Sequence, residues 1–160
     1  MKKLFIIFTF LFIFAVQAFG QNSKVVSDGT ISGSIPEDWE FYSLDEGVLF
    51  YIFAPEVEGD SFRENITITC EDVTKSIKLS DLMKVLPDTF SEVYDSFEIV
   101  EQGKDYFIFD GIVQDIHVIQ YLKLLLKNGK FYSICASSDP DDFDSYYESF
   151  KKIIDTFKIK

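Results

Sequence analysis

Alternating apolar and polar positions recur along this chain and predict the short strands of a sheet. Over residues 65–70, Ile66, Ile68 and Cys70 fall on one side and two threonines on the other, which is the pattern of a half-buried strand. Residues 48–53 (VLFYIF) are instead apolar at every position, which is typical of a central strand that is covered on both faces. The pattern therefore predicts a sheet with other elements packed on each side.

Turn residues separate the predicted strands. Residues 39–44 and 48–53 flank the turn composition Asp45-Glu46-Gly47 and together predict a hairpin. Asn128-Gly129 is the strongest hairpin signal in the chain, because both residues tolerate a positive φ. The other strands of a predicted meander are residues 98–101, 106–109, 112–126 and 131–137, with further turns at Gly103-Lys104 and Asp110-Gly111.

Two stretches carry apolar residues every three or four positions, which is the period of an amphipathic helix. Ser80 is a suitable N-cap for the first, and Pro87 lies inside it, so we expect a kink or a break there. Asp139 can cap the second, with Pro140 at its first helical position. The predicted apolar stripes are Leu82, Met83, Leu86, Phe90, Val93, Tyr94 and Phe97 in the first helix, and Phe143, Tyr147, Phe150, Ile154 and Phe157 in the second.

Residues 1–20 predict an export signal. Lys2 and Lys3 precede an apolar core of 13 residues at positions 4–16, and Ala18 and Gly20 are the small residues that a signal peptidase recognises. The apolar core is shorter than the roughly 20 residues that a membrane anchor needs, so we expect cleavage after Gly20 and no stable membrane span afterwards. A retained anchor is the alternative. The predicted location is periplasmic or secreted.

The rest of the chain is predicted to form a short leader and one domain. Residues 21–34 (QNSKVVSDGTISGS) are rich in Ser, Gly and Asn, which favours a flexible leader. Residues 35–160 have the length of a single domain and contain many aromatic side chains that need a core or a partner.

The charge of the chain excludes some classes of partner. The formal net charge is −12, and removal of residues 1–20 takes away Lys2 and Lys3, which leaves −14 over 140 residues. Such an acidic surface repels phosphate backbones and anionic headgroups, so we expect no nucleic-acid partner.

Cys70 and Cys135 are the only cysteines, and export would place them where a disulfide persists. Their even number permits one bridge between them. The alternative is that both are small core residues, since an unpaired cysteine is among the most buried side chains. The sequence has no CxxC motif or Cys/His cluster for a metal, and we expect no cofactor.

Two features suggest chemistry, and each has a structural explanation. His117 is the only histidine, but no nucleophile or orienting group can be assigned to it, so we predict a structural role and no catalytic site. Residues 139–144 (DPDDFD) suggest a calcium loop, yet they lack the alternating ligands, the central glycine and the terminal glutamate of an EF-hand. Helix capping explains this segment better.

The loop before residue 65 is acidic. Glu56, Glu58, Asp60 and Glu64 form a candidate partner-contact loop, although a run of charges is more often a solvated surface. Asn65 begins a glycosylation sequon at the start of a predicted strand, which is a poor acceptor, so we interpret it as structural.

The order of these elements resembles the superfamily of the photosystem II extrinsic protein PsbP and the Ran-binding protein Mog. The segments that carry the resemblance are residues 35–39 (IPEDW), 60–68 (DSFRENITI), 131–134 (FYSI) and 143–157. The resemblance implies a central antiparallel β-sheet with helices packed on both faces, an α+β fold of the α/β/α sandwich type.

The resemblance also implies a class of function. Members of this superfamily mostly bind other proteins or support assemblies and are not enzymes. We therefore expect an exported, non-catalytic protein that acts on another exported or envelope protein through its sheet face or its acidic loop. The alternative is a small-molecule or lipid carrier with a pocket between the kinked helix and the sheet. The sequence does not decide the oligomeric state.

Overall fold

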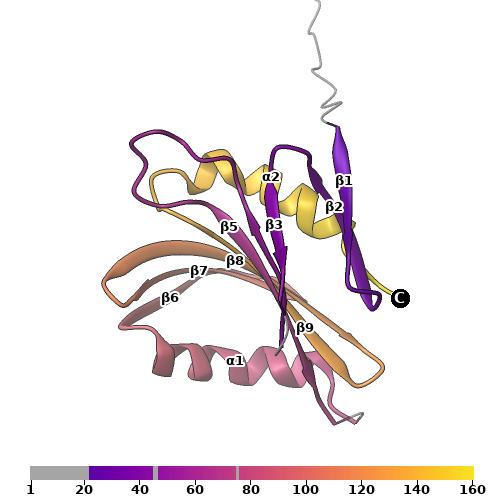
Figure 1. Cartoon of the computed structure of the whole chain (residues 1–160). Coiled ribbons are helices and arrows are strands. Elements are labelled where there is room, and N and C mark those ends of the chain that lie inside the picture. The colour runs from indigo at the N-terminus through magenta and orange to yellow at the C-terminus, as the bar shows by residue number, and fades with distance from the viewer. Residues whose placement is uncertain (1–21, 45–46, 75) are drawn as a thin grey trace, which may run out of the picture.

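A seven-stranded antiparallel sheet forms the centre of the protein, and one helix packs on each of its faces (Figure 1). The computed structural model describes residues 22–44, 47–74 and 76–160. The strands of this sheet are β3 (Glu40–Ser43), β4 (Val48–Phe53), β5 (Asn65–Asp72), β6 (Ser96–Gln102), β7 (Tyr106–Val113), β8 (Ile116–Lys127) and β9 (Lys130–Ser138), and the helices are α1 (Leu79–Val93) and α2 (Phe143–Thr156). Their order across the sheet is β3-β4-β5-β9-β8-β7-β6. The predicted fold class, an α+β sandwich with helices on both faces, is confirmed.

The two faces of the sheet have separate apolar cores. The larger core lies on the α2 side and includes Phe50, Ile52, Ile66, Ile68 and Phe150, all of which are fully buried. The smaller core lies under α1 and consists of Met83, Phe107, Phe109, Leu122, Leu124 and Phe131, with half-buried residues of α1 around it. Alternation along each strand sends successive side chains to opposite cores.

A second sheet of three strands lies beside α2. It contains β1 (Ser23–Ser27), β2 (Ile31–Pro36) and β10 (Lys158–Ile159), with β2 in the middle. The predicted flexible leader at residues 21–34 is therefore wrong from Ser23 onward. This segment forms strands instead of a flexible leader because its apolar residues Val26 and Ile31 are buried in the larger core.

Gly33 was one reason to expect a flexible leader, but its role in the structure is close packing. A Cβ at Gly33 would lie 2.6 Å from the ring of Phe157, which follows α2 and packs on β2. Glycine is needed here for close packing rather than for flexibility. The predicted signal peptide lies outside the described residues and stays a prediction.

The predicted hairpins are mostly confirmed. β8 and β9 pair through Asn128-Gly129, which have φ values of 57° and 77°, and β3 pairs with β4. Residues 45–46 of the latter turn lie outside the described residues.

The predicted Asp110-Gly111 turn is wrong. Both residues lie within β7, and the β7–β8 turn is formed by Gln114 and Asp115, which have φ values of 52° and 64°. A Cβ at Gly111 would lie 2.7 Å from Cδ1 of Tyr94, so this glycine provides room for a ring.

Both helices differ from their predicted starts. Lys78 occupies the N-cap position of α1, so Ser80 is not the cap, and Phe97 belongs to β6. The helix continues through Pro87 without a break, because its apolar side packs on the smaller core, and such packing supplies most of the stability of a helix in a protein. α2 begins at Phe143 instead of Pro140.

In the part of the chain that the structure describes, α1 covers only part of its face of the sheet. β4 is the second strand from the edge, not a central one as its apolar sequence predicted. Its residues Phe50 and Ile52 are buried on the α2 side, whereas Tyr51 and Phe53 on the other side are half-buried. The sheet residues that pack in the core under α1 come from β6, β7, β8 and β9, so no described element covers the α1-side face of β3 and β4. Within the described residues, no helix has the length and apolar character of a membrane span.

The packing of Phe157 on Gly33 gives a test of the N-terminal sheet. Gly33→Ala should lower the free energy of unfolding by about 1–3 kcal/mol, because the added methyl group collides with the ring. Chemical denaturation of this variant and of Ser32→Ala, a neighbouring strand position expected to change stability by less than about 0.5 kcal/mol, measures the difference. Equal stability of the two variants would mean that residues 23–36 are a flexible leader after all.

Candidate functional site

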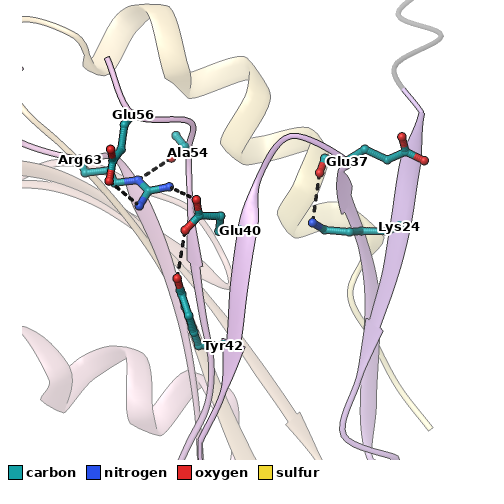
Figure 2. Close-up of polar contacts among 7 residues, drawn as sticks. All are labelled: Lys24, Glu37, Glu40, Tyr42, Ala54, Glu56 and Arg63. Atoms are coloured by element: carbon teal, nitrogen blue, oxygen red, sulfur yellow. Dashed lines mark hydrogen bonds and ion pairs between the residues drawn. The ribbon is translucent and has the colours of Figure 1, made fainter. Parts of the chain in front are cut away.

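Arg63 connects the acidic loop to the edge of the large sheet. Its Nε donates a hydrogen bond to the carbonyl oxygen of Ala54 at 2.7 Å. Its Nη2 lies 3.3 Å from Oε1 of Glu40, and its Nη1 lies 3.4 Å from Oε1 of Glu56 (Figure 2). The guanidinium also lies over the ring of Phe53, 5.2 Å from its centroid. These contacts fix the two ends of the loop and one strand edge together.

Glu40, which pairs with Arg63, also accepts a hydrogen bond from an exposed tyrosine. The hydroxyl of Tyr42 donates to Oε2 of Glu40 at 3.0 Å (Figure 2). The neighbouring guanidinium of Arg63 lowers the pKa of Glu40, and the hydrogen bond to Glu40 raises the pKa of Tyr42. Glu40 therefore accepts as a carboxylate while Tyr42 keeps its proton, which holds the ring in place on the open side of the sheet.

Three aromatic rings form the surface beside Arg63, and we call Tyr42, Tyr51 and Phe53 the aromatic face. Tyr42 and Phe53 meet edge to face with ring centroids 6.0 Å apart, and Tyr51 stacks on Phe53 with centroids 6.2 Å apart. Tyr42 is 53% exposed. The β3–β4 register, which pairs Tyr42 with Tyr51, brings these rings together. From the sequence alone, Tyr42 and Tyr51 were among the tyrosines that could line a ligand site or a partner patch, but core or half-exposed sheet positions were expected for most of them.

The four predicted loop residues do not act as one group. Glu56 pairs with Arg63, and Oδ1 of Asp60 accepts the backbone N–H of Phe62 at 3.0 Å. Glu58 is exposed, whereas Glu64 is buried. A hollow of about 240 Å³ lies within this loop, between Pro55 and Glu64. The loop is therefore an ordered structure around Arg63 rather than a simple acidic patch.

Glu64 is a buried carboxyl group close to two others. Its Oε1 accepts a hydrogen bond from the hydroxyl of Ser138 at 3.2 Å. Carboxylate oxygens of Asp60, Glu64 and Asp142 all lie within 4.8 Å of one another. Burial raises the pKa of Glu64, and the nearby charges of Asp60 and Asp142 add to the shift. Three such oxygens have the spacing to bind a cation, although acidic groups often cluster without one.

The acidic segment before α2 forms a turn. Oδ1 of Asp139 accepts the N–H of Asp141 at 2.9 Å, and its backbone oxygen accepts the N–H of Phe143 at 3.0 Å. The N-cap residue of the helix is Asp142, whose side chain makes no capping bond. Asp139, the predicted helix cap, thus stabilises the turn before α2 and is not the N-cap of the helix.

The alternative of a Cys70–Cys135 disulfide is wrong, because both thiols are free. Cys70 is the register partner of Tyr132, which is three residues away from Cys135 along β9. An odd separation places side chains on opposite faces, so Cys70 packs on the larger core and Cys135 on the smaller one. Burial raises the pKa of the Cys135 thiol to about 12, which keeps it protonated.

His117 and Asn65 each make a local contact. Nε2 of His117 lies 2.7 Å from Oδ1 of Asp110 on the neighbouring strand, and both side chains are partly exposed. Asn65 begins β5, and its Nδ2 donates to the carbonyl oxygen of Arg63 at 3.0 Å. Structural roles remain our predictions for both residues.

A groove lies between α2 and β2. It has a volume of about 500 Å³, and Trp39, Tyr146 and Ile153 contribute to its wall. We predicted a carrier pocket between the first helix and the sheet, but that interface is filled by the side chains of the smaller core. Sequence reasoning missed the groove because β2 was not predicted.

The raised pKa of Glu64 predicts how the stability of a Glu64 variant should depend on pH. Because the folded-state pKa lies above the unfolded one, folding is favoured by the protonated form, and this stability is lost as the pH rises through the folded-state pKa. Glu64→Gln should therefore be more stable than the wild type at pH 7, and this advantage should shrink at a pH below the ordinary glutamate range. Thermal unfolding at both pH values measures this.

Glu58→Gln is the matched control, because it removes the same charge from an exposed position of the same loop. An equal, pH-independent effect of the two variants would contradict the assignment of a buried, destabilised carboxylate to Glu64.

Comparison with known proteins identifies the fold. Neither protein-family models nor curated protein sequences match this chain. Among solved structures, the cyanobacterial PsbP of Synechocystis sp. PCC 6803 is 16% identical with a TM-score of 0.55, and the match covers 88% of this chain and 94% of that one. LpqN of Mycobacterium tuberculosis, described as involved in cell envelope biogenesis, is 14% identical with a TM-score of 0.61, covering 87% and 91%.

The Ran-binding protein Mog1p of Saccharomyces cerevisiae is 10% identical with a TM-score of 0.58, and the match covers 87% of this chain and 96% of that one. These similarities cover nearly all of the described chain. At such low identities they show the fold but not a shared activity. The chain therefore has the PsbP/Mog-like fold that its sequence predicted.

Proposed function

We propose that this chain is an exported, non-catalytic protein that binds another protein through its aromatic face. The observation that carries the proposal is the position of Tyr42, Tyr51 and Phe53 on the half of the sheet that α1 leaves open. Tyrosine is enriched at protein interfaces because its ring supplies apolar contact area and its hydroxyl supplies a hydrogen bond.

The aromatic face is held rigid before any partner binds. Arg63 stacks on Phe53 and pairs with Glu40, which in turn accepts the hydroxyl of Tyr42. A surface whose side chains are already ordered loses less conformational entropy on binding. Leu44, two residues after Tyr42 and therefore on the same side, adds apolar area, since it is 45% exposed.

The charge of the chain indicates the character of the partner surface. With a net charge of −12, the protein attracts basic surfaces and repels nucleic acids. The rim of the aromatic face carries Glu40 and Glu56, both partly neutralised by Arg63. A partner with an apolar centre and a basic rim would complement this surface.

The similar folds support a binding role. Mog1p is a Ran-binding protein, and LpqN is described as involved in cell envelope biogenesis. The predicted signal peptide favours an exported or envelope partner and excludes a cytosolic one of the Ran type.

Two aromatic substitutions test the proposal. Tyr42→Ser with Tyr51→Ser should weaken partner binding at least about tenfold, since buried tyrosines are frequent hot spots. In-cell crosslinking and affinity capture from the exported fraction identify the partner with the wild-type chain, and titration measures its affinity for the variants.

The matched control is Val93→Ser with Val100→Ser, which removes two exposed apolar side chains, 61% and 63% accessible, from α1 and β6. This control should bind the partner like the wild type. The proposal fails if no reproducible partner is captured, or if the control loses as much affinity as the aromatic variant.

The groove beside α2 favours a second function, that of a small-molecule carrier. Its volume of about 500 Å³ falls within the range of roughly 300–1,000 Å³ for ligand pockets. Native mass spectrometry of the exported protein would show a bound molecule if the chain is a carrier, and the bare chain mass if it is not.

A further inference from the structure

We propose that the groove between α2 and β2 binds a small, uncharged amphipathic molecule. The site lies on the α2 side of the large sheet, whereas the aromatic face lies on the α1 side. The proposal rests on the carrier function proposed for this groove, but it does not depend on protein binding at the aromatic face, so the groove and the aromatic face can each fail without the other.

The bottom of the groove is apolar and rigid. Ile35, Trp39 and Ile153 line it and are 0%, 5% and 5% exposed. The ring of Trp39 meets that of Phe150 edge to face, with centroids 6.1 Å apart, which holds the indole in the larger core. A preformed apolar bottom of this kind suits the apolar part of a ligand.

Hydroxyl groups surround this apolar bottom. Ser23, Ser34, Ser149 and Thr156 line the groove, and the side chain of Tyr146 is half-buried beside them. The N–H of Ser34 donates to Oγ1 of Thr156 at 2.8 Å, so β2 and α2 are tied together at this point. Hydroxyls both donate and accept, which suits neutral polar groups such as alcohols and amides.

The charges of the groove are balanced. Asp38 and Lys152 are its two charged lining residues, one of each sign, in a chain whose net charge is −12. Lys152 already has an interaction of its own within the chain. A charged ligand would meet no unopposed counter-charge here, and moving its charge out of water would cost free energy. The lining therefore favours a molecule without net charge.

Trp39 makes the site measurable in the unmodified protein. It is the only tryptophan of the chain, so a ligand in the groove changes the whole tryptophan emission. The probe is octyl glucoside at concentrations at which it is monomeric, with octyl sulfate and octyltrimethylammonium as its charged counterparts. The full exported chain is titrated with each probe, and native mass spectrometry counts the molecules bound.

We expect octyl glucoside to produce a saturable change in emission with one molecule per chain, and at least about tenfold weaker binding of both charged probes. Ser149→Phe, at an exposed lining position of α2, should fill the groove and weaken binding at least about tenfold. Glu148→Phe adds the same ring at the next exposed position, which does not line the groove, and should bind the probe like the wild type.

Three outcomes would overturn the proposal. They are a linear emission change without saturation, equal or tighter binding of a charged probe, and unchanged binding by Ser149→Phe. Tyr42→Ser with Tyr51→Ser should keep full probe binding, which separates this result from the test of the aromatic face. Circular dichroism of both phenylalanine variants confirms that each is folded.

Discussion

The width of the seven-stranded sheet is the constraint on which the rest of the structure depends. Strands lie about 4.8 Å apart, so seven of them span about 29 Å, whereas a helix with its side chains is only about 10–12 Å wide. One helix therefore covers only part of one face of the sheet. On the α2 side, the small sheet of β1, β2 and β10 extends the cover, and its buried residues join the larger core. On the other side, α1 and its core lie over β6, β7, β8 and part of β9, and no described element covers the α1-side face of β3 and β4.

Local turn chemistry and apolar periodicity were enough to predict most of the elements. Asn128-Gly129 has the positive φ values that its residue types favour, and the apolar stripe of α2 is buried at Phe143, Phe150 and Ile154. These features depend on residues close together in the sequence. Gly33 and Gly111 were misinterpreted because the need for glycine comes from a ring elsewhere in the chain, Phe157 in one case and Tyr94 in the other. No local pattern distinguishes such a glycine from one in a turn.

The candidate site was predictable only in part, for a related reason. The acidic loop was identified from its composition, but Arg63, the residue that organises it, was not. It is the only arginine of the chain and lies among acidic residues, and this was the one feature of the sequence that could have identified it. Its partners Glu40 and Ala54 come from positions 23 and 9 residues earlier, and only the pairing of β4 with β3 and with β5 brings them within reach. The register likewise decided that Cys70 and Cys135 lie on opposite faces.

The alternation of side chains at the start of β3 separates the two candidate surfaces. Trp39 lies in the larger core and lines the groove, while the next residue, Glu40, belongs to the opposite side and pairs with Arg63. Phe41 and Tyr42 repeat this alternation, since their register partners are Ile52 on the α2 side and Tyr51 on the α1 side. The two surfaces thus share a backbone segment but no side chain. A one-residue shift in the β3–β4 register would turn Glu40 and Tyr42 to the α2 side and Trp39 and Phe41 to the α1 side, so both surfaces depend on this pairing.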